Sequence, residues 1–235
     1  MKKLQPVYFA LDFPTGEEAL DFLEKHHLNG IPVKVGMELY YREGAVILQV
    51  LKSRGHSIFL DLKLHDIPAT VGRTMKNLAN LDVDVVNVHA QGGSEMMRQA
   101  VQGLEASEKE RPVLLAVTML TSSDQKMVER ELLLEREIGE VVSHYTELAK
   151  NSGVDGVVCS VHEAEQVRES GMLALTPGIR LDASDSHDQK RVATPHVAKV
   201  QGSHSIVVGR AIRDAEDPYT TYHQIKEAFS NEIYH

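Results

Sequence analysis

Residues 58–66 have the sequence Ile-Phe-Leu-Asp-Leu-Lys-Leu-His-Asp, an apolar run with charged side chains at two alternating positions. A short apolar run bounded by polar residues is typical of a buried β-strand. Because side chains alternate along a strand, Asp61 and Lys63 are expected on one face and the intervening leucines on the other. If the leucines face covering helices, the two charged groups face the interior of the sheet.

Short runs rich in β-branched residues recur through the whole chain of 235 residues. Eight candidate strands lie at residues 7–11, 33–36, 58–62, 85–89, 114–118, 156–160, 173–176 and 205–208. Stretches of helical period lie at residues 17–26, 44–54, 71–80, 94–106, 138–151 and 219–229. Such alternation implies parallel strands joined by right-handed crossovers. Eight repeats with nothing left over predict an α/β fold, a closed (β/α)8 TIM barrel, as a single domain over residues 1–235.

An open Rossmann-like sheet is the alternative architecture. Its dinucleotide-binding form needs Gly-x-Gly-x-x-Gly after the first strand, where residues 10–14 read Ala-Leu-Asp-Phe-Pro instead. No linker rich in Pro, Gly and Ser divides the sequence into domains. The polar stretch at residues 181–190 is expected to form a mobile loop at the active site.

Composition narrows the classes of partner. With 25 Lys and Arg against 34 Asp and Glu, the formal net charge is −9, and no long basic run is present. A nucleic-acid partner or an anionic membrane surface is therefore disfavoured. The single cysteine, Cys159, cannot form an intramolecular disulfide, and neither a signal peptide nor a membrane-spanning run is apparent. We therefore expect a cytoplasmic protein.

Charged residues cluster at the ends of the first three strands. Asp12 ends the first strand, Lys34 lies inside the apolar second strand, and the third carries Asp61 and Lys63, with Asp66 shortly beyond. Catalytic groups of such barrels come from these C-terminal strand ends. Since buried charges are costly unless paired, we expect Lys34, Asp61 and Lys63 to form an ion network. The alternatives are a purely structural ion pair and, for Asp12, a helix N-cap.

Two later strands are each followed by a glycine and then an arginine. Residues 176–180 read Thr-Pro-Gly-Ile-Arg, and residues 208–212 read Val-Gly-Arg-Ala-Ile. The loops after strands seven and eight are the usual phosphate site of this fold. Although a glycine in a tight turn beside a solvated arginine is common, two such loops at the two expected positions predict a phosphate-bearing ligand at Arg180 and Arg210.

Residues 61–71, Asp-Leu-Lys-Leu-His-Asp-Ile-Pro-Ala-Thr-Val, closely resemble the Asp-x-Lys-x-x-Asp-Ile-Pro-x-Thr signature of orotidine 5'-monophosphate decarboxylases of the bacterial type. The resemblance extends to residues 10–12, 33–36, 117–122, 176–180, 188–191 and 208–210. It implies a cofactor-free (β/α)8-barrel lyase that converts orotidine 5'-monophosphate to uridine 5'-monophosphate (UMP) in the last step of de novo pyrimidine nucleotide synthesis. It also implies a homodimer in which Asp66, Ile67 and Thr70 enter the partner's active site.

The resemblance implies a role for each matching residue. Lys63 would protonate a vinyl carbanion-like ring carbon, and Lys34, Asp61 and Asp66 would complete a catalytic charge array with it. Asp12 and Lys34 would contact the ribose and Thr121 the pyrimidine. The full set of implied substrate-binding residues is Asp12, Lys34, Asp61, Ile67, Thr70, Thr121, Pro177, Arg180, Gln189, Gly209 and Arg210. The chain departs from the family pattern at residues 184–187 and 202–204, which are peripheral positions.

Two other functions fit parts of the same pattern. A 3-keto-gulonate 6-phosphate decarboxylase has similar Asp and Lys spacing but uses Mg²⁺, and the Ile-Pro-Ala-Thr continuation at residues 67–70 argues against it. A non-catalytic barrel would bind UMP without turnover, which the complete set of charged residues argues against. The histidines lack metal-ligand spacing, so no metal is expected; His89, which ends the fourth strand, is the one histidine placed to line the barrel mouth.

Overall fold

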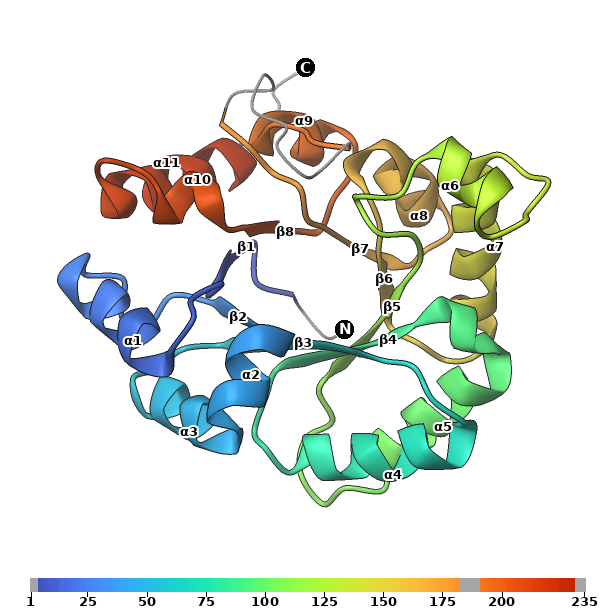
Figure 1. Cartoon of the computed structure of the whole chain (residues 1–235), viewed down its shortest axis with the longest axis horizontal. Helices are drawn as coiled ribbons and strands as arrows, with labels where there is room; N and C mark the ends of the chain where they lie inside the picture. The colour runs from blue at the N-terminus through green and yellow to red at the C-terminus, as the bar shows by residue number, and fades with distance from the viewer. Residues whose placement is uncertain (1–3, 182–190, 231–235) are drawn as a thin grey trace.

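The computed structural model describes residues 4–181 and 191–230. Within them, eight parallel strands form a closed barrel in chain order, with the last strand paired to the first (Figure 1). The strands are β1 (Val7–Ala10), β2 (Val33–Gly36), β3 (Ile58–Leu64), β4 (Val85–His89), β5 (Val113–Val117), β6 (Gly156–Val158), β7 (Leu173–Thr176) and β8 (Ser205–Val208). The predicted (β/α)8 barrel is confirmed, and an open Rossmann-like sheet is excluded.

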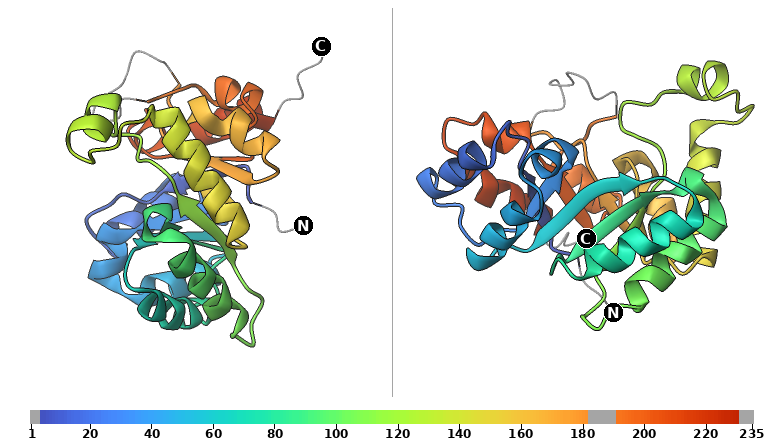
Figure 2. Two further views of the ribbon diagram at one scale, coloured as in Figure 1. Left: turned by 90° about the vertical axis from the view of Figure 1, so that its right-hand side faces the viewer. Right: turned by 60° about the horizontal axis from the view of Figure 1, so that its bottom comes forward.

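Helices surround the barrel on its outside (Figures 1 and 2). They are α1 (Gly16–Lys25), α2 (Met37–Glu43), α3 (Ala45–Ser53), α4 (Pro68–Ala79), α5 (Gly93–Glu105), α6 (Gln125–Arg130), α7 (Ile138–Asn151), α8 (Ala164–Glu169), α9 (Pro195–Val200), α10 (Arg210–Arg213) and α11 (Pro218–Ser230). Short 3-10 turns, η1 (Ala90–Gly92) and η2 (Val161–Glu163), follow β4 and β6. The described helices include no segment long and apolar enough to cross a membrane.

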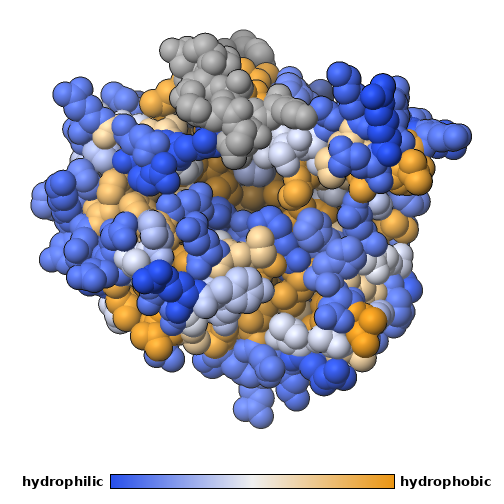
Figure 3. All heavy atoms as spheres, viewed as in Figure 1, coloured by the Kyte–Doolittle hydropathy of each residue, from blue (hydrophilic) through white to orange (hydrophobic). Residues whose placement is uncertain are grey.

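Two apolar layers lie on the two faces of the barrel wall. The inner layer contains Tyr8 and Phe59, whose rings meet edge to face with centroids 5.9 Å apart, together with inward-facing residues of the other strands. The outer layer, between strands and helices, contains Leu60 and Leu62. Full burial of each such leucine contributes about 1.5–3 kcal/mol. Hydrophilic residues predominate at the periphery in Figure 3, and apolar residues become visible toward its centre.

Local signals fix where the helices next to the site begin. The Thr15 hydroxyl accepts a hydrogen bond from Glu18 N at the start of α1, and Thr194 caps α9 in the same way. Helix α4 begins at Pro68, because proline at the first helical position sacrifices no helical hydrogen bond. Asp66 and Ile67 consequently lie in the short turn between β3 and α4.

Candidate active site

A cavity of about 230 Å³ opens at the C-terminal ends of the strands. Nine predicted site residues lie on its wall: Asp12, Lys34, Asp61, Lys63, Thr121, Pro177, Arg180, Gly209 and Arg210. The rest of the described wall is mainly apolar and was not predicted: Ala10, Phe59, Val117, Met119, Leu120, Val158, Leu175, Gly178 and Val207. Charged groups therefore converge on a chamber with a partly apolar wall, where electrostatic interactions are stronger than in water.

The ion network expected from the sequence is present. Lys34 Nζ lies 3.2 Å from Asp12 Oδ1 and 3.4 Å from Asp61 Oδ2. Lys63 Nζ lies 2.7 Å from Asp61 Oδ1. Asp61 is thus shared between two ammonium groups from neighbouring strands, and the array runs Asp12, Lys34, Asp61, Lys63 around one side of the cavity.

This ion network fixes the charge states of its two most buried side chains, Asp61 and Lys34. Burial alone would raise the pKa of the Asp61 carboxyl, but Lys34 and Lys63 outweigh burial and hold that pKa below its ordinary value. Burial alone would lower the pKa of the Lys34 ammonium, but Asp61 and Asp12 hold it above its ordinary value. At neutral pH the cavity therefore contains an ionised carboxylate and a charged ammonium held side by side.

Simple strand alternation does not continue through Lys63. Leu60 pairs with Val86 and Leu64 with Val88, so four residues of β3 span the distance of two in β4. This bulge places Lys63 at φ 51°, in the left-handed region that side chains other than glycine avoid. The expectation that Lys63 and Asp61 meet is correct, but a bulge rather than regular alternation brings them together.

A buried amide on β4, Asn87, supports both residues. Its Nδ2 donates to Asp61 Oδ1 at 2.7 Å, and its Oδ1 accepts from the backbone N of Lys63, also at 2.7 Å. Sequence reasoning did not single out Asn87. The available signal was a polar residue between the apolar valines of a buried strand.

The predicted phosphate-binding residues lie at β7 and β8. Arg180 is only 5% exposed, and its guanidinium donates to Ile179 O at 3.0 Å. Gly209 lies where an added Cβ would come within 3.4 Å of Asp12 Oδ2, so the chain passes close to the first strand. Arg180 and Arg210 both line the cavity and supply local positive charge in a chain of net charge −9. Gln189 lies outside the described residues.

Four predicted residues lie away from this described wall: Asp66, Ile67, Thr70 and His89. Asp66 is exposed and accepts a hydrogen bond from Ile67 N at 2.6 Å, and Ile67 is 66% exposed. The His89 ring packs against the His65 ring, with centroids 5.7 Å apart. Burial is the largest cause that lowers the pKa of His89, and the neighbouring His65 is the second. His89 is not among the residues that line the described cavity, so its predicted place at the barrel mouth stays a prediction.

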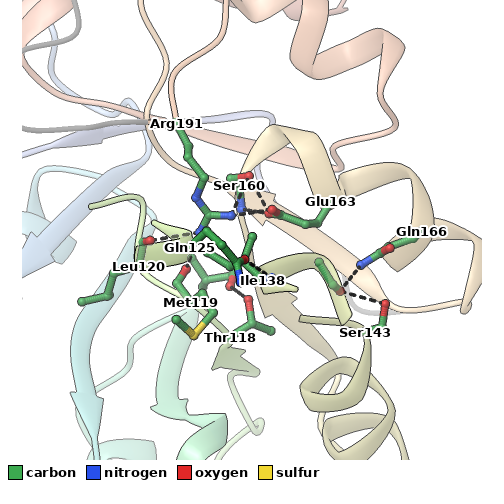
Figure 4. Close-up of polar contacts among 12 residues, drawn as sticks. Thr118, Met119, Leu120, Gln125, Ile138, Ser143, Ser160, Glu163, Gln166 and Arg191 are labelled. Atoms are coloured by element: carbon green, nitrogen blue, oxygen red, sulfur yellow. Dashed lines mark hydrogen bonds and ion pairs between the residues drawn. The ribbon is translucent and has the colours of Figure 1, made fainter. Parts of the chain in front are cut away.

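An arginine network beside the cavity was also missed (Figure 4). One nitrogen of the Arg191 guanidinium donates to Leu120 O at 3.0 Å, and the other contacts the Glu163 carboxylate and Ser160 Oγ. Arg191 thereby connects the segments that follow β5, β6 and β7. The Ser-x-x-Glu spacing of residues 160–163 was a visible signal, but by itself it indicates only a capping box.

Known proteins share both the sequence and the geometry. The family model described as "Orotidine 5'-phosphate decarboxylase / HUMPS family" matches residues 5–225. The chain belongs to this family. The relationship inferred from residues 61–71 is thereby confirmed.

Individual members of the orotidine 5'-phosphate decarboxylase / HUMPS family match over nearly their whole length. The orotidine 5'-phosphate decarboxylase of Bacillus cereus (strain G9842) is 52% identical over 231 residues, 95% of this chain and 96% of that protein. That of Bacillus pumilus (strain SAFR-032) is 54% identical over 222 residues, 92% of this chain and 95% of that protein. The solved structure of orotidine 5'-phosphate decarboxylase from Lactobacillus acidophilus superposes with a TM-score of 0.85 at 41% identity, covering 97% of this chain and 100% of that one.

Proposed function

We propose that this protein is an orotidine 5'-phosphate decarboxylase, a carboxy-lyase that converts orotidine 5'-monophosphate to UMP and CO2 in the last step of de novo UMP synthesis. The observation that carries the proposal is the Lys34–Asp61–Lys63 array in the same cavity as Arg180 and Arg210. Strands β3 and β7 lie four positions apart in the eight-stranded ring, so the array and Arg180 lie across the cavity from each other. The spacing suits a ligand with a reacting ring at one end and a phosphate at the other.

The proposed reaction uses Lys63 as the proton donor. The bond between the ring carbon and its carboxylate breaks, CO2 leaves, and the electron pair stays on the ring carbon. The Lys63 ammonium then protonates that carbon to form the C–H bond of UMP, and the lysine regains its proton from solvent. One proton is consumed for each CO2 released.

Asp61 would raise the energy of the bound substrate. Two like charges about 4 Å apart cost about 4 kcal/mol at an effective dielectric constant near 20, and the neighbouring lysines reduce that value. The repulsion ends as the substrate carboxylate leaves as CO2. The ammonium of Lys63 is held in place before reaction, so it stabilises negative charge that develops only in the transition state.

The remaining residues on the wall would hold the rest of the nucleotide. Arg180, Arg210 and Gly209 would receive the phosphate together with Gln189, while Asp12 and Lys34 would hydrogen-bond the ribose. Thr121 and Pro177 would contact the base and the adjoining segment. Binding energy from the distant phosphate can then be used to orient the ring against Lys63.

A homodimer would complete the site. Asp66, Ile67 and Thr70 lie off the described cavity wall, and Ile67, in the turn between β3 and α4, is 66% exposed. In the proposed assembly, the partner's Asp66 extends the charge array past Lys63. We also propose that this enzyme is cytoplasmic and that its barrel forms one catalytic domain.

The deciding experiment mixes EDTA-treated protein with orotidine 5'-monophosphate and follows the ultraviolet change on conversion to UMP. Rapid turnover without added metal is expected. Turnover of 3-keto-gulonate 6-phosphate that requires Mg²⁺, without turnover of orotidine 5'-monophosphate, would instead indicate a sugar-phosphate decarboxylase. Tight binding of UMP with no turnover would indicate a binding protein.

A further inference from the structure

Asn87 occupies a position that this kind of barrel normally fills with an apolar side chain. On β4, Val86 and Val88 belong to the outer apolar layer, and Val85 belongs to the inner one, so Asn87 faces inward. Inward positions of such barrels are mainly branched aliphatic residues. Asn87 is only 2% exposed, and a buried amide is costly unless its polar atoms are paired.

The first contact of this amide compensates for the bulge in β3. Between the pairs Leu60–Val86 and Leu64–Val88, the regular ladder between β3 and β4 is interrupted. The backbone N–H of Lys63 lies in the interruption and donates to Asn87 Oδ1 at 2.7 Å. Asn87 thereby replaces a strand hydrogen bond and supports the φ of 51° at Lys63, a conformation that is unfavourable in residues other than glycine.

The second contact fixes the carboxylate of Asp61. Asp61 Oδ1 accepts a hydrogen bond from Asn87 Nδ2 and forms an ion pair with Lys63 Nζ, each at 2.7 Å. Asp61 Oδ2 forms an ion pair with Lys34 Nζ at 3.4 Å. A carboxylate held from both oxygens cannot rotate without losing a charged contact. The two ends of one amide thus hold the carboxylate of Asp61 and the backbone from which the Lys63 ammonium extends.

We propose that Asn87 is a positioning residue, whose side-chain amide orients the Asp61 carboxylate and the Lys63 backbone so that both charged groups face the reacting end of the substrate. The inference rests on the proposed decarboxylase function for its kinetic test. Asn87 itself is not on the described cavity wall, so it acts through its two neighbours.

Two substitutions at Asn87 separate positioning from mere stability. Asn87→Ala removes both hydrogen bonds. In Asn87→Asp, the introduced carboxyl keeps the shape, and when protonated it can donate to Asp61 and accept from Lys63 N–H. When ionised it loses the donor and places a second negative charge beside Asp61.

The charged and titratable groups near the introduced carboxyl come from several strands. Asp61 and Lys63 lie on β3, Lys34 lies behind Asp61 on β2, and His89 follows on β4 itself. His65 packs on His89 from the β3–α4 turn. Burial and Asp61 favour the protonated form of the introduced carboxyl, whereas Lys63 favours the ionised form.

For Asn87→Ala we expect kcat to fall about 10- to 100-fold, with KM for orotidine 5'-monophosphate and Kd for UMP within about threefold of wild type. For Asn87→Asp we expect kcat to approach the wild-type value at low pH and to fall as pH rises through the pKa of the introduced carboxyl. The pH profile of the wild type should not show this fall. Thr146→Val is the matched control, because Thr146 is equally buried and its hydroxyl donates only to Val142 O within α7. That control is expected to leave kcat and its pH profile unchanged.

A measurement independent of turnover distinguishes this inference from the proposed function. Carbon-13 NMR titration of Asp61 is expected to show a higher carboxyl pKa in Asn87→Ala than in wild type, because a hydrogen bond to the charged form is lost. An unchanged Asp61 titration, or unchanged kcat in a folded Asn87→Ala, would overturn the positioning role. If the wild type is inactive but the Asp61 pKa is still higher in Asn87→Ala, the proposed reaction would be refuted and the positioning role of Asn87 would stand. If Asn87→Ala does not fold, the pH profile of Asn87→Asp decides.

Discussion

Lys63 Nζ lies 2.7 Å from Asp61 Oδ1 although the backbone of Lys63 departs from regular strand geometry at φ 51°. One partner of the ion pair therefore extends from a strained backbone position, which the bulge in β3 and the amide of Asn87 hold in place. Strain of this kind persists only where the surroundings enforce it, and it is concentrated at functional sites. The positions of charge in this cavity are fixed before any ligand binds.

Replacing Lys63 by alanine is expected to abolish turnover while retaining nucleotide binding. The substitution removes both the proposed proton donor and the cation that faces the developing carbanion, so kcat should fall by about 10⁴-fold or more. Binding of UMP, measured by calorimetry, should stay within a few-fold because the arginines are intact. Lys25→Ala, on the exposed end of α1, is the control. Turnover near the wild-type rate in Lys63→Ala would refute the assigned role.

Asp61→Asn is expected to destabilise the protein at neutral pH by about 3 kcal/mol, because it leaves two ammonium groups without their shared counterion. The folded-state pKa of Asp61 is below the ordinary value of 3.8. The stabilisation is therefore fully present above about pH 4 and is lost as pH falls through the folded-state pKa. Urea unfolding at several pH values should show a difference from wild type that shrinks in acid. Equal stability at pH 7 would contradict the prediction, and Asp21→Asn, at an exposed position of α1, is the control.

The strands and the longer helices could be predicted because their signals are local. The predicted strands agree with the structure within two residues, and the six predicted helices within three. The missed helices α2, α6, α8, α9 and α10 have four to seven residues each, too short to show a helical period. The helical period alone places the start of α4 three residues late, because the first turn is marked by Pro68, an N-terminal signal, and not by apolar periodicity.

The ion network could be predicted because barrel topology brings the ends of neighbouring strands together. Lys34 and Asp61 lie on adjacent strands, so their pairing follows from fold and periodicity. Asn87 and Arg191 could not be found in this way, since their contacts depend on the bulge at Lys63 and on side-chain rotamers and not on strand order or periodicity. The bulge at Lys63 likewise carries no local signal such as glycine.

The proposed homodimer predicts complementation between two inactive variants. Lys63→Ala lacks the proton donor in its own site, and Asp66→Ala lacks the carboxylate supplied to its partner's site. Mixing and reassociating equal amounts should form heterodimers with one intact site, restoring about a quarter of wild-type activity if subunits exchange at random. Activity that does not recover, while sedimentation shows mixed dimers, would contradict the shared site. Mixing Lys63→Ala with Asp61→Ala is the control, because each substitution damages its own subunit's array and no heterodimer then contains an intact site.

Arg210→Ala is expected to weaken substrate binding through the phosphate alone. Loss of a charged hydrogen bond to an anion costs about 1.5–3 kcal/mol, so kcat/KM for orotidine 5'-monophosphate should fall about 10- to 100-fold. The nucleoside orotidine has no phosphate, and its much slower turnover should be unchanged by the substitution. Arg130→Ala, exposed at the end of α6, is the control. An equal loss on both substrates would place Arg210 outside the phosphate site.

The Arg191–Glu163 pair is expected to stabilise the cavity rim (Figure 4). Glu163 is 7% exposed, and Arg191 also donates to Leu120 O, which belongs to a segment that lines the cavity. Arg191→Ala leaves the buried carboxylate without its cation, so the free energy of unfolding should fall by about 3–5 kcal/mol.

The double variant Arg191→Ala, Glu163→Gln should recover part of this loss, because the unpaired charge is then removed. Urea unfolding of the two single variants and the double variant measures the coupling. Arg98→Ala, which breaks an exposed pair with Glu95 on α5, should cost less than about 1 kcal/mol. Strictly additive losses for Arg191 and Glu163 would mean that the two side chains do not act as a pair. A coupled loss accompanied by a raised KM would show that the same contact also holds the Leu120 segment against the bound base.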